Sequence, residues 1–505
     1  MKMGCAAEIG GVAYAALRQA RLTSLLGLLL LSGCAVGPDF SKPVLAKDAG
    51  YLSTGTAKLA GSGGQKIAYG ADVPGRWWEL FQNKHLDALM QRAIVHSPTL
   101  EAARAALTQA NETALAERGS LFPQFTSSGS VERSKTASTG IYNLYSLQPE
   151  VSWSLDLFGG NRRSVEAVRA AAEAQAFEAE ATYLTLTSDL AEGVIQEASY
   201  REQIRATNEI ISALRELLGV LETQVDVGTA SRANVLQQKA TLAEAEASLP
   251  ALEKERDQQQ NAIAVLAGQF PNARSGAPFT LASLRLPHDL PLSVPASLVR
   301  QRPDVRNAEA LMHQASAEIG VATANMLPDF TLSASLPTSA SAIGDLFTTA
   351  TSGWSLAAGI TQPIFEGGTL LHKKRAAVAA YKEAAANYRA VVLDAFKDVA
   401  DALRAIQHDG DALRAYVKAE RAAKESLDLS RAIVKAGTGV YTDVLTAQQT
   451  YQNARIARVQ AEAQRYLDAV ALFEALGGGW WNRPDNLASR ANPSRSTILT
   501  SGNKQ

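Results

Sequence analysis

Two near-identical breaks interrupt long helical patterns in this chain. The first is VDVGTASRANVL at residues 225–236, and the second is VKAGTGVYTDVL at residues 434–445. Another pair repeats in the same order, because SPTLEAARAALTQANETALAERGSLFPQF (97–125) matches RPDVRNAEALMHQASAEIGVATANMLPDF (302–330). Repeated segments in matching order are the signature of a tandem duplication. The sequence therefore predicts two copies of one fold.

Each copy carries the same succession of predicted elements. A helix of about 23 residues lies between two prolines, from Thr99 to Pro123 and from Asp304 to Pro328. Two segments of alternating apolar and polar residues follow, which predict a β-hairpin with one apolar face. In the first copy the apolar residues are Val151, Trp153, Leu155 and Leu157; in the second they include Phe330, Leu332, Trp354, Leu356 and Ile360. The predicted loops are TASTGIYNLYS and PTSASAIGDLFTTATSG.

Long helical patterns follow each hairpin. They run over residues 162–225 and 369–435, and at 1.5 Å per residue each predicts a helix about 100 Å long. The second carries a heptad pattern with Val399, Ile406 and Leu427 in one seam, which indicates coiled-coil packing. After each glycine–threonine break a return helix is predicted, over residues 231–267 and 440–476. No globular core needs helices of this length.

The predicted hairpins indicate whether this part of the chain lies in water or in a membrane. Four strands with one apolar face leave open edges, and in a membrane every backbone polar group must be satisfied, so such a sheet must close. Four strands cannot close a barrel alone, whereas three chains would supply twelve, within the range of outer-membrane barrels. The predicted fold is an α+β membrane protein with a 12-stranded trimeric barrel, continued by a long α-helical coiled-coil tunnel. The alternative is a soluble α+β protein with two surface hairpins.

The N-terminus has the layout of a lipoprotein signal peptide over residues 1–33. Arg18 and Arg21 precede the apolar stretch LTSLLGLLLLSGC, which ends in a lipobox-like Leu-Ser-Gly-Cys. Cys34 is the predicted lipidation site, carrying diacylglycerol and an N-acyl chain, and no other cofactor is expected. Ala35 stands where an inner-membrane retention signal favours Asp, so the outer membrane is the predicted location. The alternative is a buried free cysteine at the end of a transmembrane anchor.

Several segments resemble the outer-membrane factors of tripartite efflux systems. They are CAVGPDFSKP (34–43), RWWELFQNKHLDAL (76–89), LVRQRPDVRNAE (298–309) and the two Gly-Thr breaks. The chain is most similar to the NodT-like branch of the TolC-like channels. This resemblance implies a homotrimer in the Gram-negative outer membrane with a helical part in the periplasm. It also implies docking to a periplasmic adaptor and an inner-membrane RND-type pump.

The repeats and the resemblance together predict the domain organisation. A lipidated N-terminal segment packs around the equator, two repeats are joined by a linker, and a disordered tail follows. The predicted ranges are 34–96 for the segment, 97–270 and 302–481 for the repeats, 271–301 for the linker and 482–505 for the tail.

The resemblance also implies a periplasmic gate at the Gly-Thr breaks. In the TolC-like family these tips constrict the closed pore, and an Asp shortly after the second Gly-Thr lines it. Asp443 holds that place here, with Asn234 at the equivalent position of the first copy. The gate residues expected are therefore Gly228, Thr229, Asn234, Gly437, Thr438 and Asp443. Two departures change the expected network, since Gly439 replaces a basic residue and Thr446 replaces a second Asp. The alternative is that Asp443 only caps the return helix.

The expected function is a passive channel for small molecules, powered by its inner-membrane partner. The sequence contains no P-loop, nucleophile constellation or catalytic carboxylate pair, so an enzyme is not expected. Six histidines lie scattered without ligand spacing, so no metal site is expected, and a net charge of −1 with no basic block argues against nucleic acid. The alternatives are a lipoprotein adaptor or structural coiled coil of the envelope, and a type I protein secretion channel.

Overall fold

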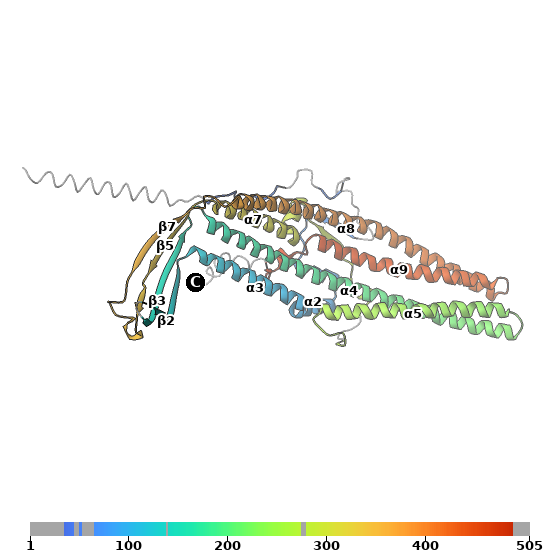
Figure 1. The fold of residues 1–505 in the computed structure, drawn as a ribbon. Helices are drawn as coiled ribbons and strands as arrows, with labels where there is room; N and C mark the ends of the chain where they lie inside the picture. The colour runs from blue at the N-terminus through green and yellow to red at the C-terminus, as the bar shows by residue number, and fades with distance from the viewer. Residues whose placement is uncertain (1–34, 45–49, 53–64, 138–139, 274–278, 488–505) are drawn as a thin grey trace, which may run out of the picture. The chain divides into compact units, whose positions relative to one another are not determined.

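The computed structural model describes residues 35–44, 50–52, 65–137, 140–273 and 279–487 (Figure 1). The predicted signal peptide, Cys34 and most of the predicted tail lie outside these residues. The chain divides into two compact units. The first comprises Met1–Pro43, Thr108–Ala174 and Glu309–Asn387, and the second comprises Val44–Leu107, Gln175–Ala308 and Tyr388–Gln505.

An antiparallel sheet dominates the first unit. Its path is β2-β3-β5-β7, and a short strand β6 also pairs with β3. The strands span Gln124–Thr136 (β2), Gly140–Leu155 (β3), Asp329–Ser335 (β5), Thr338–Ala340 (β6) and Ser355–Thr361 (β7). Both predicted hairpins are therefore confirmed. The loop expected at TASTGIYNLYS is wrong, because β3 already begins at Gly140. The segment after this glycine contains Ile141, Tyr142 and Tyr145, which favour strands.

The strand register gives this sheet one apolar face. Phe125 pairs with Val151 across β2 and β3, and Trp153 pairs with Leu332 across β3 and β5. Leu332 in turn pairs with Ala358 of β7. Directly paired residues lie on the same side of a sheet, so the apolar rows line up across all four strands. The predicted one-sided alternation is confirmed.

Six helices follow the predicted order. They are α3 (Pro98–Arg118), α4 (Gly160–Asp226), α5 (Arg232–Leu266), α7 (Pro303–Ala324), α8 (Thr369–Lys435) and α9 (Tyr441–Ala475). The long and return helices end within two residues of the predicted bounds. The two short helices stop four or more residues before Pro123 and Pro328. The first continues as the 3-10 helix η3 (Gly119–Leu121), and Phe122 is extended because the proline that follows disfavours the helical region. Val399, Ile406 and Leu427 of the predicted seam are buried on α8.

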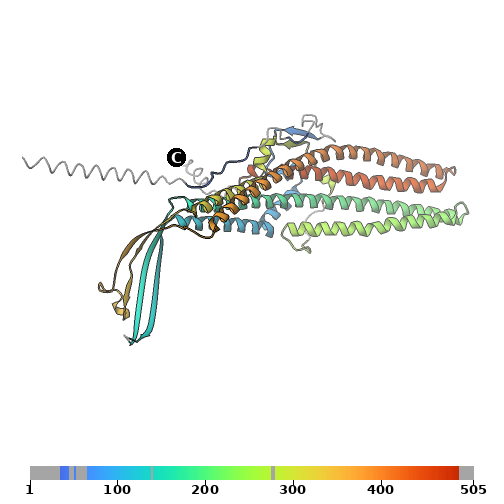
Figure 2. The ribbon, with the colours of Figure 1, turned by 45° about the horizontal axis from the view of Figure 1, so that its top comes forward.

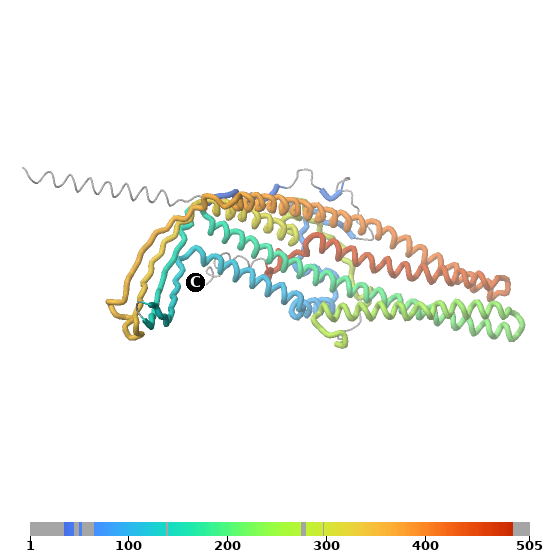
Figure 3. Tube along the Cα trace, in the orientation of Figure 1, coloured from blue at the N-terminus to red at the C-terminus, as the bar shows by residue number. Residues whose placement is uncertain are grey.

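The second unit contains the tips and most of the length of the two helical hairpins. Figures 2 and 3 show α4 turning back into α5, and α8 turning back into α9. No helix within the described residues combines the length and apolar character that a membrane span requires.

A small region of the second unit was not expected from the sequence. Strand β1 (Lys66–Tyr69) pairs in parallel with β4 (Asp289–Leu292), joining the N-terminal segment to the predicted linker. Short helices accompany this pair: η2 (Trp77–Phe81), α2 (Lys84–His96), η4 (Leu281–Ser283), α6 (Pro295–Gln301) and η6 (Trp480–Asn482).

Buried aromatic residues hold this region together. Trp77 stacks on Phe473 of α9 with ring centroids 5.4 Å apart, and Trp78 is fully buried. Both tryptophans are therefore structural anchors of this region. The residues that follow η6 also pack, since Arg483 pairs with the buried Glu180 and Leu487 is buried. The start of the tail at residue 482 was therefore predicted too early.

Candidate functional site

The two helical tips share one backbone geometry. Gly228 and Gly437 both have φ of +79°, which strongly favours glycine. At the first tip the amide of Thr229 donates to the carbonyl of Gln224 at 2.8 Å. At the second, Thr438 donates to Ile433 at 3.3 Å. Each glycine amide adds a second bond, from Gly228 to the carbonyl of Val225 at 2.9 Å and from Gly437 to that of Val434 at 3.0 Å, which completes a Schellman motif. The duplicated Gly-Thr pairs therefore end α4 and α8 in the same way.

Gly439 is restricted by its surroundings. A Cβ atom there would lie 2.7 Å from Cγ2 of Ile433 and 3.1 Å from the amide nitrogen of Val434. A basic side chain at this place, as in the family pattern, would collide with the last turn of α8. The departure from that pattern thus has a steric reason in this chain.

The starts of the return helices differ between the two copies. In α5 the Ser231 hydroxyl accepts a bond from the amide of Asn234 at 3.2 Å, whereas Val440 gives α9 no side-chain cap. Asp443 occupies the α9 position equivalent to Asn234. Its side chain is exposed and makes no hydrogen bond or ion pair with the described residues. It is therefore free to interact outside the chain, although a carboxylate in the first turn also suits the helix dipole.

A buried tie between the hairpins was missed by the sequence reasoning. The Tyr441 hydroxyl donates to Oε1 of Gln238 at 2.9 Å, and Nε2 of Gln238 donates to the carbonyl of Leu214 at 2.8 Å. Gln238 is fully buried and Tyr441 is nearly so. Burial raises the pKa of Tyr441, so the phenol stays a neutral donor. This tie links α9 to α5 and α4.

Apolar contacts surround the tie. Tyr441 packs with Leu221 and Val235, and Leu217 contacts both this cluster and one formed by Leu427, Val444 and Ala447. The sequence did not single out the tie, because Tyr441, which stands where the first copy has Arg232, is one of many positions that differ between the copies.

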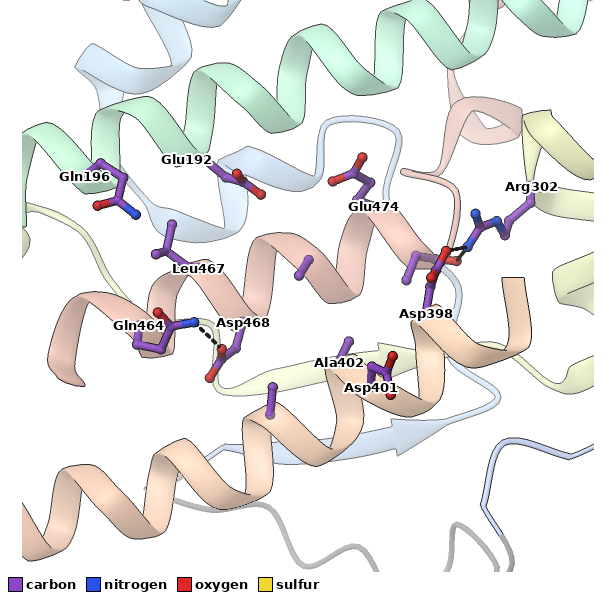
Figure 4. Close-up of a pocket in the computed structure, with 13 residues that line it drawn as sticks. Glu192, Gln196, Arg302, Asp398, Asp401, Ala402, Gln464, Leu467, Asp468 and Glu474 are labelled. Atoms are coloured by element: carbon purple, nitrogen blue, oxygen red, sulfur yellow. Dashed lines mark hydrogen bonds and ion pairs between the residues drawn. The ribbon is translucent and has the colours of Figure 1, made fainter. Parts of the chain in front are cut away.

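A cavity of about 620 Å³ lies farther along the same helices (Figure 4). Carboxylates from three helices line it: Glu192 of α4, Asp398 and Asp401 of α8, and Asp468 and Glu474 of α9. Arg302 is the cation at its edge, 3.1 Å from Asp398. Burial is the main cause that raises the pKa of Glu474 to about 7, and the charges of Glu192 and Asp189 raise it further. Burial similarly raises the pKa of Asp468 to about 6.

The raised pKa of Glu474 predicts a pH-dependent stability. The unfolded chain releases this proton near pH 4.3 and the folded chain near pH 7, so folded stability falls as pH rises between these values. Glu474→Gln removes that loss. We expect it to stabilise the protein by about 1 kcal/mol at pH 8, after allowance for solvent screening, and to have little effect near pH 5.

The measurement is the thermal unfolding midpoint in detergent at both pH values. Glu425→Gln, on the exposed surface of α8, is the matched control and should shift neither midpoint. Equal effects of Glu474→Gln at the two pH values would contradict the prediction.

Comparison with known proteins identifies the family. A family model described as outer membrane efflux protein matches residues 89–269 and 294–478, one match in each repeat. The pyoverdine export outer membrane protein OpmQ of Pseudomonas aeruginosa is 30% identical over 427 residues, covering 82% of this chain and 90% of the relative. The chain belongs to the outer membrane efflux protein family.

Two further comparisons are consistent with this membership. Nodulation protein T of Rhizobium leguminosarum bv. viciae is 28% identical over 477 residues, covering 91% of this chain and 94% of that protein. The solved structure of the outer-membrane channel OprN superimposes with a TM-score of 0.81 at 26% identity, covering 88% of this chain and 100% of that one.

Membership of the outer membrane efflux protein family confirms several predictions. The TolC-like fold, the role as an outer-membrane efflux channel and the Gram-negative outer-membrane location are all confirmed. The family consists of channels, which conduct rather than catalyse. The envelope adaptor alternative is thereby disfavoured. The assignment of individual tip residues to a gate stays a prediction.

Proposed function

We propose that three copies of this chain close one twelve-stranded barrel and act as the exit duct of a tripartite efflux pump. The observation that carries this proposal is the sheet of the first unit. Its apolar face is exposed in the single chain, with Phe125 at 72%, Leu356 at 73% and Ile360 at 68% exposure. Such a face needs lipid to cover it.

The sheet edges argue for several copies rather than one. Within the described residues β2 and β7 each pair on one side only, so both edges carry unpaired backbone groups. A bilayer provides no water to satisfy these groups, so a membrane sheet must be closed. Identical copies joined edge to edge, β7 of one to β2 of the next, satisfy every strand.

The remaining partners follow from this arrangement. The helical tips would meet a periplasmic adaptor, which links the duct to an inner-membrane RND-type pump, and acyl chains on Cys34 would anchor the trimer. The relatives carry names for pyoverdine export, solvent efflux and cation efflux. Such varied cargo on one fold supports a passive duct for small molecules, with selection made by the pump.

The decisive experiment is the native mass of the protein extracted from membranes in mild detergent. We expect a heat-sensitive trimer, because only a closed sheet is stable there. Leu332→Arg places a charge on the apolar face and should cost about 2–4 kcal/mol if it lies near the bilayer midplane, reducing the trimer fraction sharply. Ser333→Arg, on the opposite face of β5, is the matched control and should leave more trimer.

A monomeric native mass for the unaltered protein would refute the trimeric barrel. Equal trimer fractions for the two arginine variants would show that the face bearing Leu332 does not contact lipid.

A further inference from the structure

The two loops that lead from a strand into a long helix share one motif. The chain reads LDLFGG (155–160) after β3 and PIFEGG (363–368) after β7. In each loop a phenylalanine lies just before a pair of glycines, and the first glycine of the pair has a positive φ, +77° in one loop and +61° in the other. Phe158 and Phe365 therefore hold equivalent places, with Glu366 as one extra residue in the second loop.

The strands that begin each hairpin also match. β2 begins within LFPQF (121–125) and β5 begins within MLPDF (326–330). Phe125 and Phe330 therefore hold equivalent places at the starts of these strands. Each repeat thus supplies one phenylalanine from a strand start and one from a loop.

Two of these four rings pack together inside the chain. β3 and β5 are neighbours in the sheet, with Leu155 paired to Phe330. The loop after β3 then brings the ring of Phe158 to that of Phe330, with the ring centroids 6.4 Å apart. Both side chains are half-buried. An aromatic contact therefore closes the junction between the first repeat and the second.

The other two rings are uncovered in the single chain. Phe365 and its neighbour Ile364 are each 88% exposed, and Phe125 is 72% exposed. They adjoin β7 and β2, which lie at opposite edges of the sheet (Figure 1). If β7 of one copy joins β2 of the next, the loop after β7 meets the start of β2 as the loop after β3 meets the start of β5.

We propose that Phe365 of one copy packs on Phe125 of the next, repeating between chains the contact that Phe158 and Phe330 make within each chain. We call this pair of Phe365 and Phe125 the clasp. The inference rests on the proposed trimer. A second copy is the occupant that the repeat symmetry favours, because it offers the equivalent ring on the equivalent strand. The end of the barrel nearest the helices then carries six like aromatic contacts, three within chains and three between chains.

Thiol cross-linking of the full-length protein in membranes tests the clasp. The double variant Phe125→Cys with Phe365→Cys is treated with a mild oxidant or with a short bis-maleimide, and the products are separated under denaturing conditions. We expect a covalent trimer, because each chain is then joined to both neighbours. Each single variant should give no covalent trimer, which also controls for the natural Cys5 and Cys34.

Val131→Cys with Phe365→Cys is the matched control pair. Val131 lies on β2 and is 72% exposed, as Phe125 is, but it lies about 20 Å farther along the strand. We expect this pair to cross-link at least about tenfold less than the clasp pair. Phe158→Cys with Phe330→Cys, at the junction within the chain, should react readily but leave a monomer under denaturing conditions.

Dissociation of the trimer gives a second readout. Phe365→Ala should make the native trimer dissociate about tenfold faster in detergent, because three aromatic contacts are lost in each trimer. Phe365→Leu keeps apolar bulk and should have a smaller effect. Phe347→Ala is the matched control, since Phe347 is 80% exposed in the segment between β6 and β7, and it should leave the rate unchanged.

The outcomes separate the clasp from the trimer on which it rests, because the same samples are also sized in mild detergent without cross-linking. A trimeric native mass with no cross-link between the clasp positions, or with equal cross-linking of the Val131 pair, would overturn the clasp. A trimer whose Phe365→Ala variant dissociates no faster would overturn it too and would indicate that lipid covers these rings. A monomeric native mass would refute the trimer itself, and the clasp with it.

Discussion

Tyr441→Phe is expected to raise the open probability of the channel roughly tenfold. The substitution keeps the ring packed against Leu221 and Val235 but leaves Oε1 of the buried Gln238 without its donor. An unsatisfied buried polar atom costs about 1–3 kcal/mol, and 1.4 kcal/mol is tenfold in an equilibrium. The loss weakens the arrangement in which α9 is tied to α5, and we predict that this arrangement is the closed one. Single-channel recording in planar bilayers measures the effect.

Tyr451→Phe is the matched control for this prediction. Tyr451 also lies on α9 and packs against an apolar cluster, but its hydroxyl makes no hydrogen bond with the described residues. The double variant Tyr441→Phe with Gln238→Leu removes both partners of the tie, so its effect should be smaller than the sum of the single effects. Identical recordings for Tyr441→Phe and Tyr451→Phe would show that the tie does not hold the tips closed.

Asp443→Ala is expected to increase conductance and reduce the preference for cations. In the proposed trimer three copies of this exposed carboxylate converge on the pore axis, where they attract cations and repel one another. Conductance and reversal potential in a salt gradient across a planar bilayer report both effects.

Asp443→Asn separates the gate from the capping alternative. Asparagine keeps a side-chain oxygen suited to helix starts but carries no charge. If the charge lines the pore, Asp443→Asn should change selectivity as Asp443→Ala does. If Asp443 only supports α9, the asparagine variant should behave like the unaltered protein. Glu425→Ala, an exposed carboxylate on α8, controls for general surface charge.

Local patterns explain why so much of the fold was predictable. The helical period and the Gly-Thr breaks placed α4, α5, α8 and α9 within two residues of their observed bounds. Alternation along β3, β5 and β7 identified one apolar face, which the register then confirmed. The duplication helped, because a weak signal such as β2 had a stronger counterpart in the other copy.

The features that the sequence did not predict are contacts between distant segments. The parallel pair of β1 with β4 joins residues more than 200 positions apart, and neither strand is long enough to show a periodic pattern. The carboxylate-lined cavity gathers side chains from three helices, each of which looks like an ordinary charged helix surface when taken alone. The spacing of residues along the sequence does not predict contacts between side chains of distant segments.

The sequence by itself determined the repeated order of helices and hairpins, the turn glycines and the one-sided strands, since these depend on backbone preferences and periodic burial within short windows. Only the tertiary structure decided that Tyr441 meets Gln238 and that Arg163 meets the carbonyl of Val36. Those pairings depend on which helix faces which, and that is set by the packing of the whole unit rather than by any local stretch of chain.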